Sequence, residues 1–95
     1  MTIYSLDIPE VVRDELYALD YSVAERFLKK LRKILHNPHV PKNKLRGLPN
    51  CYKIKLRDDG IRGVYQVHDQ EIRVLLIAVG KRDKSAVYET AKIRL

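Results

Sequence analysis

Three cationic side chains alternate with apolar ones in one short stretch of the sequence, at positions 53, 55 and 57. Residues two apart in a β-strand point to the same face, so Lys53, Lys55 and Arg57 are predicted to stand side by side. After a short turn, Arg62 and Gln66 share one face of the next predicted strand. Like charges packed together cost folding free energy, which a bound anion such as phosphate would offset. The alternative interpretation is a solvated strand surface that carries cations for solubility.

An RNA phosphodiester is an anion that such a cluster can cut without a metal or cofactor. Cleavage needs a base for the 2′-hydroxyl, positive charge beside the phosphate and an acid for the leaving 5′-oxygen. A lysine among cations has a lowered pKa, because like charge disfavours its protonated form, and it can then act as a base. Arginine stays charged and binds phosphate oxygens in pairs. A tyrosine can stack on a base or orient the hydroxyl.

The remaining reactive residue types form weaker patterns. His36 and His39 lie three apart beside prolines, without a nearby cysteine or paired carboxylate, and are interpreted as surface residues rather than metal ligands. Cys51 has no histidine at an obvious spacing and is predicted to pack at the start of a strand. Turn or structural roles are assigned to Asp58, Asp59 and His68.

Two helices are predicted in the first half of the chain. Alternation over residues 2–8 predicts a strand, after which Pro9 suits the first turn of a helix capped by Asp7 or Ile8 and ending near residue 19. Ser22 and Glu25 have the spacing of a capping box. The second helix should follow to about residue 36, and its apolar stripe is Val23, Phe27, Leu31, Ile34 and Leu35.

The second half of the chain is predicted to be mostly sheet. Strands are expected over residues 51–57, 61–68 and 72–79, the last apolar enough to be central and covered on both faces. Gly60 supplies the left-handed conformation of the first hairpin loop, and residues 85–94 suit a terminal helix. The order β-α-α-β-β-β-α predicts one α+β domain over residues 1–95, with an N-terminal helical hairpin packed on a small antiparallel-rich sheet.

The positive charge is concentrated in the second half of the chain. Residues 1–41 carry six basic and six acidic residues, whereas residues 42–95 carry thirteen and six, which accounts for the net charge of +7. Such a field attracts polyanions, of which nucleic acid is the commonest. No apolar run is long enough to span a membrane, no signal peptide is apparent, and a single cysteine fits a reducing cytoplasm.

Four segments of the sequence form a distinctive set: NKLRGLPNCYKIKLR from Asn43, GIRGVYQV from Gly60, VGKR from Val79 and VY at Val87 and Tyr88. Together they resemble the RelE toxins of bacterial toxin–antitoxin pairs. The resemblance runs over nearly the whole chain and implies a microbial-ribonuclease-like fold. It also implies a ribosome-dependent endoribonuclease that cuts mRNA in the ribosomal A site, leaves a 2′,3′-cyclic phosphate and stops translation.

The resemblance also implies a role for each matching residue. Lys55 matches the general base, Lys53 and Arg62 match the cations that stabilise the pentacoordinate phosphate, and Arg82 matches the general acid. Tyr88 matches the tyrosine that stacks on and orients the mRNA. Contacts to the RNA backbone are expected from Arg46, Lys44 and Lys81. Arg57 lies outside this set.

The family further implies a RelB-type antitoxin that wraps the toxin, covers its basic face and displaces the helix that carries Tyr88. Operator DNA would be bound only through the antitoxin complex. Gly63 departs from the family, which usually has a large aliphatic residue there, and Ile61 replaces a common aromatic. A glycine within a strand is expected to weaken the strand and to leave a packing gap beside Arg62.

Two other functions fit parts of the sequence. Relatives in the same superfamily inhibit DNA gyrase without cutting RNA, but they typically lack the lysine pair and the arginine–tyrosine ending. A catalytically silent module that binds nucleic acid through its basic surface is the other alternative. Substitutions of Lys55 and Arg82 separate catalysis from adhesion, since only catalysis can be lost while ribosome binding is kept.

Overall fold

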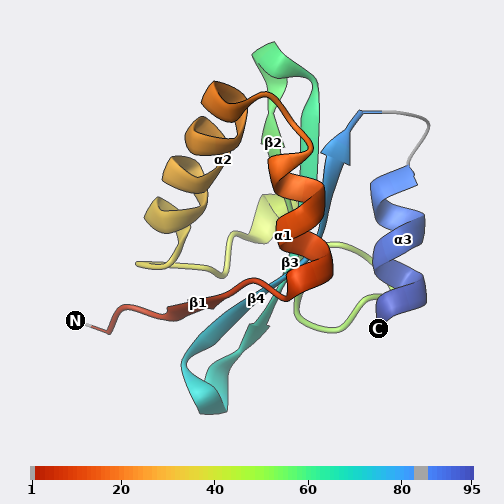
Figure 1. The fold of residues 1–95 in the computed structure, drawn as a ribbon. Helices are drawn as coiled ribbons and strands as arrows, with labels where there is room; N and C mark the ends of the chain where they lie inside the picture. Colours follow the sequence, from red (N-terminus) through yellow and green to blue (C-terminus); the bar gives the residue numbers. More distant parts are fainter. Residues whose placement is uncertain (1, 83–85) are drawn as a thin grey trace.

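The computed structural model describes residues 2–82 and 86–95. Its four strands form one sheet, and its three α-helices lie against the two faces of that sheet (Figure 1). The elements are β1 (Ser5–Asp7), α1 (Glu10–Tyr17), α2 (Tyr21–Ile34), β2 (Cys51–Leu56), β3 (Ile61–His68), β4 (Arg73–Lys81) and α3 (Ala86–Arg94), with 3-10 turns at Pro41–Asn43, Arg57–Asp59 and Asp69–Glu71. The predicted order and α+β class are confirmed. Ser85, where the last helix was expected to begin, lies outside the described residues.

The sheet has the strand order β1-β4-β3-β2. β2 pairs antiparallel with β3, and β3 pairs antiparallel with β4. Only β1 runs parallel to its neighbour β4, so the sheet is antiparallel-rich as predicted. β4 is internal and largely buried, which confirms the prediction of a covered central strand. β2 is an edge strand, and its cationic side chains, Lys53 and Lys55, lie on one face of the sheet.

The sheet separates two hydrophobic clusters, one on each of its faces. The helical hairpin of α1 and α2 packs on one face through residues such as Leu16, Phe27 and Leu31, all fully buried. α3 packs on the other face through Val87 and Ala91. The apolar stripe predicted for α2 is confirmed. Among the described residues, no helix is long and apolar enough to cross a membrane.

The helix starts differ from those predicted. Pro9 is itself the N-cap of α1, in place of Asp7 or Ile8. α2 begins at Tyr21 with Asp20 as N-cap, so Ser22 lies inside the helix and its hydroxyl donates to the Asp20 carboxylate at 2.7 Å. The predicted capping box is therefore wrong. Three residues connect α1, which ends at Tyr17, to α2, which begins at Tyr21.

Gly63 does not leave a gap in the sheet, contrary to expectation. It lies opposite Ile54 on the face that the helical hairpin covers. The ring of Phe27 occupies the space where a side chain would stand, because a Cβ atom built on Gly63 would lie 2.6 Å from Phe27 Cζ. The glycine is thus matched to a large aromatic residue on α2. Arg62, next along the strand, is supported by a filled core.

Candidate active site

Lys53 and Lys55 lie on the face of the sheet against which α3 packs. Lys53 pairs across the hairpin with Val64, and Lys55 pairs directly with Arg62. Both lysines and Arg62 are only partly exposed. Cys51 precedes them on the same face and is fully buried, as predicted, and burial raises the pKa of its thiol to about 11. That thiol is therefore a packing group and not a nucleophile at neutral pH.

A small cavity of about 210 Å³ lies between Lys55 and the end of β4, and Lys53, on the same face of β2, is not part of its lining. Among the described residues, four cations and no carboxylate line it: the cations are Lys55, Arg57, Arg62 and Arg82. The turn before β3 forms its wall, where Gly60 adopts the predicted left-handed conformation at φ 65°. The backbone N–H of Arg82 donates to the Gly60 carbonyl at 2.6 Å. This bond fixes the end of β4 against the hairpin, so residues far apart in sequence meet at one point.

Charge accumulation changes the protonation of Lys55. Its pKa is lowered, first by the positive charge of Lys53, then by desolvation and by the charges of Arg62, Arg57 and Arg82. A lysine with a lowered pKa has a larger fraction of neutral amine near neutral pH. Lys55 can therefore accept a proton, while the surrounding arginines stay charged. The cavity holds a base beside fixed positive charge.

Arg62 faces the tyrosine of the terminal helix. Its guanidinium carbon lies 5.6 Å from the centroid of the Tyr88 ring, within the range of a cation–π contact. The buried Nε of Arg62 has no hydrogen-bond partner among the described residues. A buried donor left without a partner costs free energy. The arrangement is suited to a ligand that has both a phosphate and an aromatic base.

The terminal helix is anchored at its far end by Arg94. The Arg94 guanidinium donates to both Glu15 carboxylate oxygens, at 2.9 and 2.6 Å, and to the Ile77 carbonyl at 2.8 Å. These hydrogen bonds raise the pKa of Arg94. The bidentate pair ties α3 to α1 and β4, and so determines how firmly Tyr88 is held over Arg62. Neither Glu15 nor Arg94 was singled out from the sequence.

Replacing Arg94 with alanine is expected to lower the free energy of unfolding by about 1–2 kcal/mol. Hydrogen bonds to charged groups contribute about 1.5–3 kcal/mol, and partial exposure of the pair reduces that contribution. Hydrogen exchange should also accelerate in α3 before the rest of the protein unfolds. The matched control is Lys92→Ala on the same helix, where the exposed pair with Glu89 spans 3.5 Å. Equal stability and exchange in both variants would show that Arg94 does not anchor α3.

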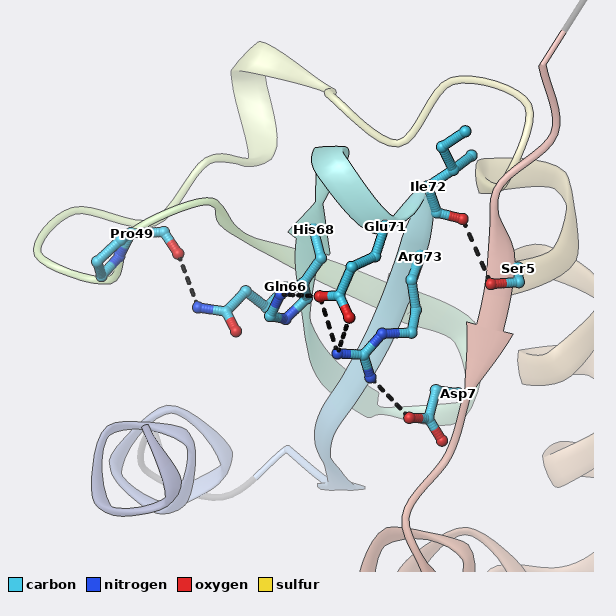
Figure 2. A network of polar contacts seen from close by, with 8 residues as sticks. All are labelled: Ser5, Asp7, Pro49, Gln66, His68, Glu71, Ile72 and Arg73. Carbon is cyan, nitrogen blue, oxygen red and sulfur yellow. Dashed lines mark hydrogen bonds and ion pairs between the residues drawn. The ribbon is translucent and has the colours of Figure 1, made fainter.

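The three residues expected to contact the RNA backbone do not line the cavity. Lys44 and Arg46 are exposed in the loop before β2, which borders a separate, wide depression. Figure 2 shows how Gln66 fixes this loop, donating from its side-chain amide to the Pro49 carbonyl at 3.1 Å. Lys81 pairs with Ile61, whose side chain packs in the core under the helical hairpin. The Lys81 side chain lies on that same face and is therefore directed away from Arg62.

One polar network, centred on His39 and Asp69, was not predicted from the sequence. His39 contacts the Tyr52 hydroxyl through Nδ1 at 2.8 Å and the Asp69 carboxylate through Nε2 at 2.7 Å. The Tyr4 hydroxyl donates to the same carboxylate at 2.7 Å, which lowers the pKa of Asp69. The network ties the segment after α2 to the sheet. His39 is thus a structural residue.

The chain is similar to toxins of known families. The family model described as ParE toxin of the type II toxin–antitoxin system parDE matches residues 8–86. The mRNA interferase toxin RelE of Escherichia coli strain K12 is 48% identical over 92 residues, which cover 97% of each chain. A free double arginine-to-alanine variant of E. coli RelE superposes with a TM-score of 0.91 at 46% identity, covering 99% of both chains. The same variant with an antitoxin RelBc peptide superposes with a TM-score of 0.82 at 47% identity, covering 95% of both.

Proposed function

Because the chain belongs to the RelE toxins within the ParE toxin family of type II toxin–antitoxin systems, we propose that it is an mRNA interferase. It cuts mRNA in the ribosomal A site and so stops translation. The observation that supports this function best is the position of Lys55, a lysine with a lowered pKa beside a cavity lined by arginines. A cation-lined cavity with its own base can cleave RNA through the 2′-hydroxyl of the substrate.

In the proposed reaction, the neutral amine of Lys55 removes the proton of the 2′-hydroxyl. The resulting oxygen attacks the adjacent phosphorus, which becomes pentacoordinate. Lys53 and Arg62 stabilise the added negative charge, since fixed cations aimed at developing charge lower the barrier. The bond between phosphorus and the 5′-oxygen breaks and the leaving oxygen takes a proton from water, so the products are a 2′,3′-cyclic phosphate and a 5′-hydroxyl.

Arg82 stands at the position of the proposed general acid. Arginine does not give up its proton readily, because the guanidinium is a very weak acid. We therefore assign Arg82 the role of a hydrogen-bond donor that neutralises charge on the leaving 5′-oxygen. Arg57 lines the same cavity, so we add it to the cations that bind the phosphate. Tyr88 stacks on the base of the nucleotide that is cut, in front of Arg62.

The partner proposed for neutralisation is a RelB-type antitoxin. The antitoxin covers the cationic face and displaces α3, which removes Tyr88 from Arg62. The Glu15–Arg94 pair is then one contact that the antitoxin has to break. Binding to operator DNA is proposed for the toxin–antitoxin complex and not for this chain alone. We place the free toxin in the bacterial cytoplasm, where its ribosomal substrate is found.

The proposed function is tested with purified protein and ribosomes programmed with a defined mRNA. We expect cleavage within the A-site codon on ribosomes and little cleavage of the same mRNA when it is free. Intact A-site mRNA in the presence of folded protein would rule out the mRNA interferase. Accumulation of stalled gyrase–DNA complexes when the same purified protein is added to gyrase and DNA would identify the gyrase-inhibiting branch of the superfamily instead.

A further inference from the structure

A second cationic groove lies beside the candidate active site, along the open edge of β2. It encloses about 370 Å³ between that edge, α2 and the turn at Pro41–Asn43. Its apolar floor is formed by Ile34 and Ile54, and its rim carries the cations Lys30, Lys42, Lys55 and Arg57. Lys55 and Arg57 also line the active-site cavity. The two hollows are therefore neighbours that share two cationic side chains.

The fold fixes the ammonium group of Lys30 and the backbone that carries Lys42. The Lys30 ammonium group donates a hydrogen bond to the backbone carbonyl of Lys55, which fixes it at the edge of β2. Lys42 stands in a turn closed by backbone bonds from Asn43 to Val40, at 2.9 Å, and from Lys44 to Pro41, at 3.2 Å. Preorganised charges bind an anion at a smaller cost in side-chain ordering than mobile ones.

As far as the structure describes the chain, no carboxylate lines the groove, whereas carboxylates neutralise other cations of this protein. Arg26 pairs with Asp59, Arg73 with Asp7, and Arg94 with Glu15. Among residues 2–82 and 86–95, neither Lys42 nor Arg57 has a carboxylate within salt-bridge distance. Asp59, the acid of the neighbouring turn, is held by Arg26 at 2.6 Å. The positive charge of the groove is thus left for an external anion.

We propose that this groove binds a second backbone phosphate of RNA, next to the position where the strand is cut. The inference rests on the proposed function and extends it from one phosphate to two. Two neighbouring cationic hollows suit a ligand with regularly repeated negative charge, and the apolar floor accommodates a ribose or base edge. The phosphate comes either from the mRNA itself or from ribosomal RNA beside it, and the test below distinguishes these two sources.

The test compares Lys42→Gln with Lys33→Gln, which removes the same charge from an exposed position of α2 outside both hollows. Binding of each variant to programmed ribosomes is measured over a range of salt concentrations. Lys42→Gln is expected to weaken binding roughly 3–10-fold and to reduce the salt slope by about one phosphate contact. Lys33→Gln should stay close to the wild type. Equal effects of the two substitutions would overturn the proposal.

A second arm identifies the source of the phosphate by placing an uncharged methylphosphonate on either side of the cleavage position of the mRNA. If the groove binds mRNA, one such position weakens the wild type but not Lys42→Gln. If neither position matters while Lys42→Gln still weakens binding, the phosphate belongs to ribosomal RNA. Binding is measured with an mRNA that carries a 2′-deoxy nucleotide at the cleavage position, so no cut occurs, and cleavage is measured separately with the all-ribose mRNA. Intact mRNA would then count against the proposed function alone.

Discussion

Replacing Lys55 with alanine is expected to lower the rate of mRNA cleavage on programmed ribosomes by about 10²–10⁴-fold, the usual contribution of a positioned acid or base. The neighbouring cations Lys53 and Arg62 remain in this variant, so ribosome binding should change far less than the rate. Single-turnover cleavage measures the rate at saturating protein, and a separate titration measures binding. Lys29→Ala, on the exposed side of α2, is the matched control and should cleave like the wild type.

The pH dependence of the same reaction tests how Lys55 acts. A base has to be deprotonated, so the rate should rise with pH until the amine of Lys55 is neutral. Lys53 makes the largest contribution to the lowered pKa of Lys55. Lys53→Met should therefore raise the pKa of Lys55 and shift the rising limb to higher pH. An unshifted limb in Lys53→Met, or a Lys55→Ala variant that binds and cuts at the wild-type rate, would exclude Lys55 as the base.

Gly63→Leu is expected to destabilise the protein by about 1–3 kcal/mol or more, as in other overpacked cores. Phe27 is fully buried, so its ring cannot easily move away from a new side chain at 2.6 Å. Phe27→Leu alone should also destabilise the protein, because it leaves a cavity above the glycine. Urea unfolding monitored by circular dichroism gives the free energy of each variant.

The double variant Phe27→Leu with Gly63→Leu should recover much of the lost stability, because the two volumes compensate. The coupling free energy between neighbours of this kind is about 0.5–3 kcal/mol. Simple addition of the two single effects would mean that Phe27 does not fill the space over Gly63. Cleavage by the recovered double variant would show that Arg62 is held in place by a filled core, whichever residues fill it.

Local sequence patterns were sufficient to predict the helices, the strands and the shared face of Lys53 and Lys55. The strict alternation around Lys53 and Lys55 predicted that they share a face, and the paired strands confirm it. Gly60 predicted the hairpin turn because few other residues adopt a left-handed conformation readily. These features depend on neighbours in the sequence. A pattern of two or four residues therefore predicts them.

The remaining features depend on contacts between segments far apart in the sequence. The approach of Arg82 to Gly60 follows from the pairing of β3 with β4, and the contact of Tyr88 with Arg62 follows from how α3 lies on the sheet. No periodicity predicts the Glu15–Arg94 pair, and the filling of Gly63 by Phe27 needs the three-dimensional packing. The resemblance to RelE toxins placed Arg82 and Tyr88 in the site, but it left Arg57 outside the cavity that it lines.

The attack of the 2′-hydroxyl on the phosphate is tested most directly by removing that hydroxyl from one nucleotide. Ribosomes are programmed with an mRNA that carries a single 2′-deoxy nucleotide at the mapped cleavage position. The mechanism predicts no cut at that position, whereas the all-ribose mRNA gives a 2′,3′-cyclic phosphate and a 5′-hydroxyl. Cleavage of the 2′-deoxy position at the normal rate would contradict an account in which the cationic cluster cuts RNA with the substrate's own hydroxyl.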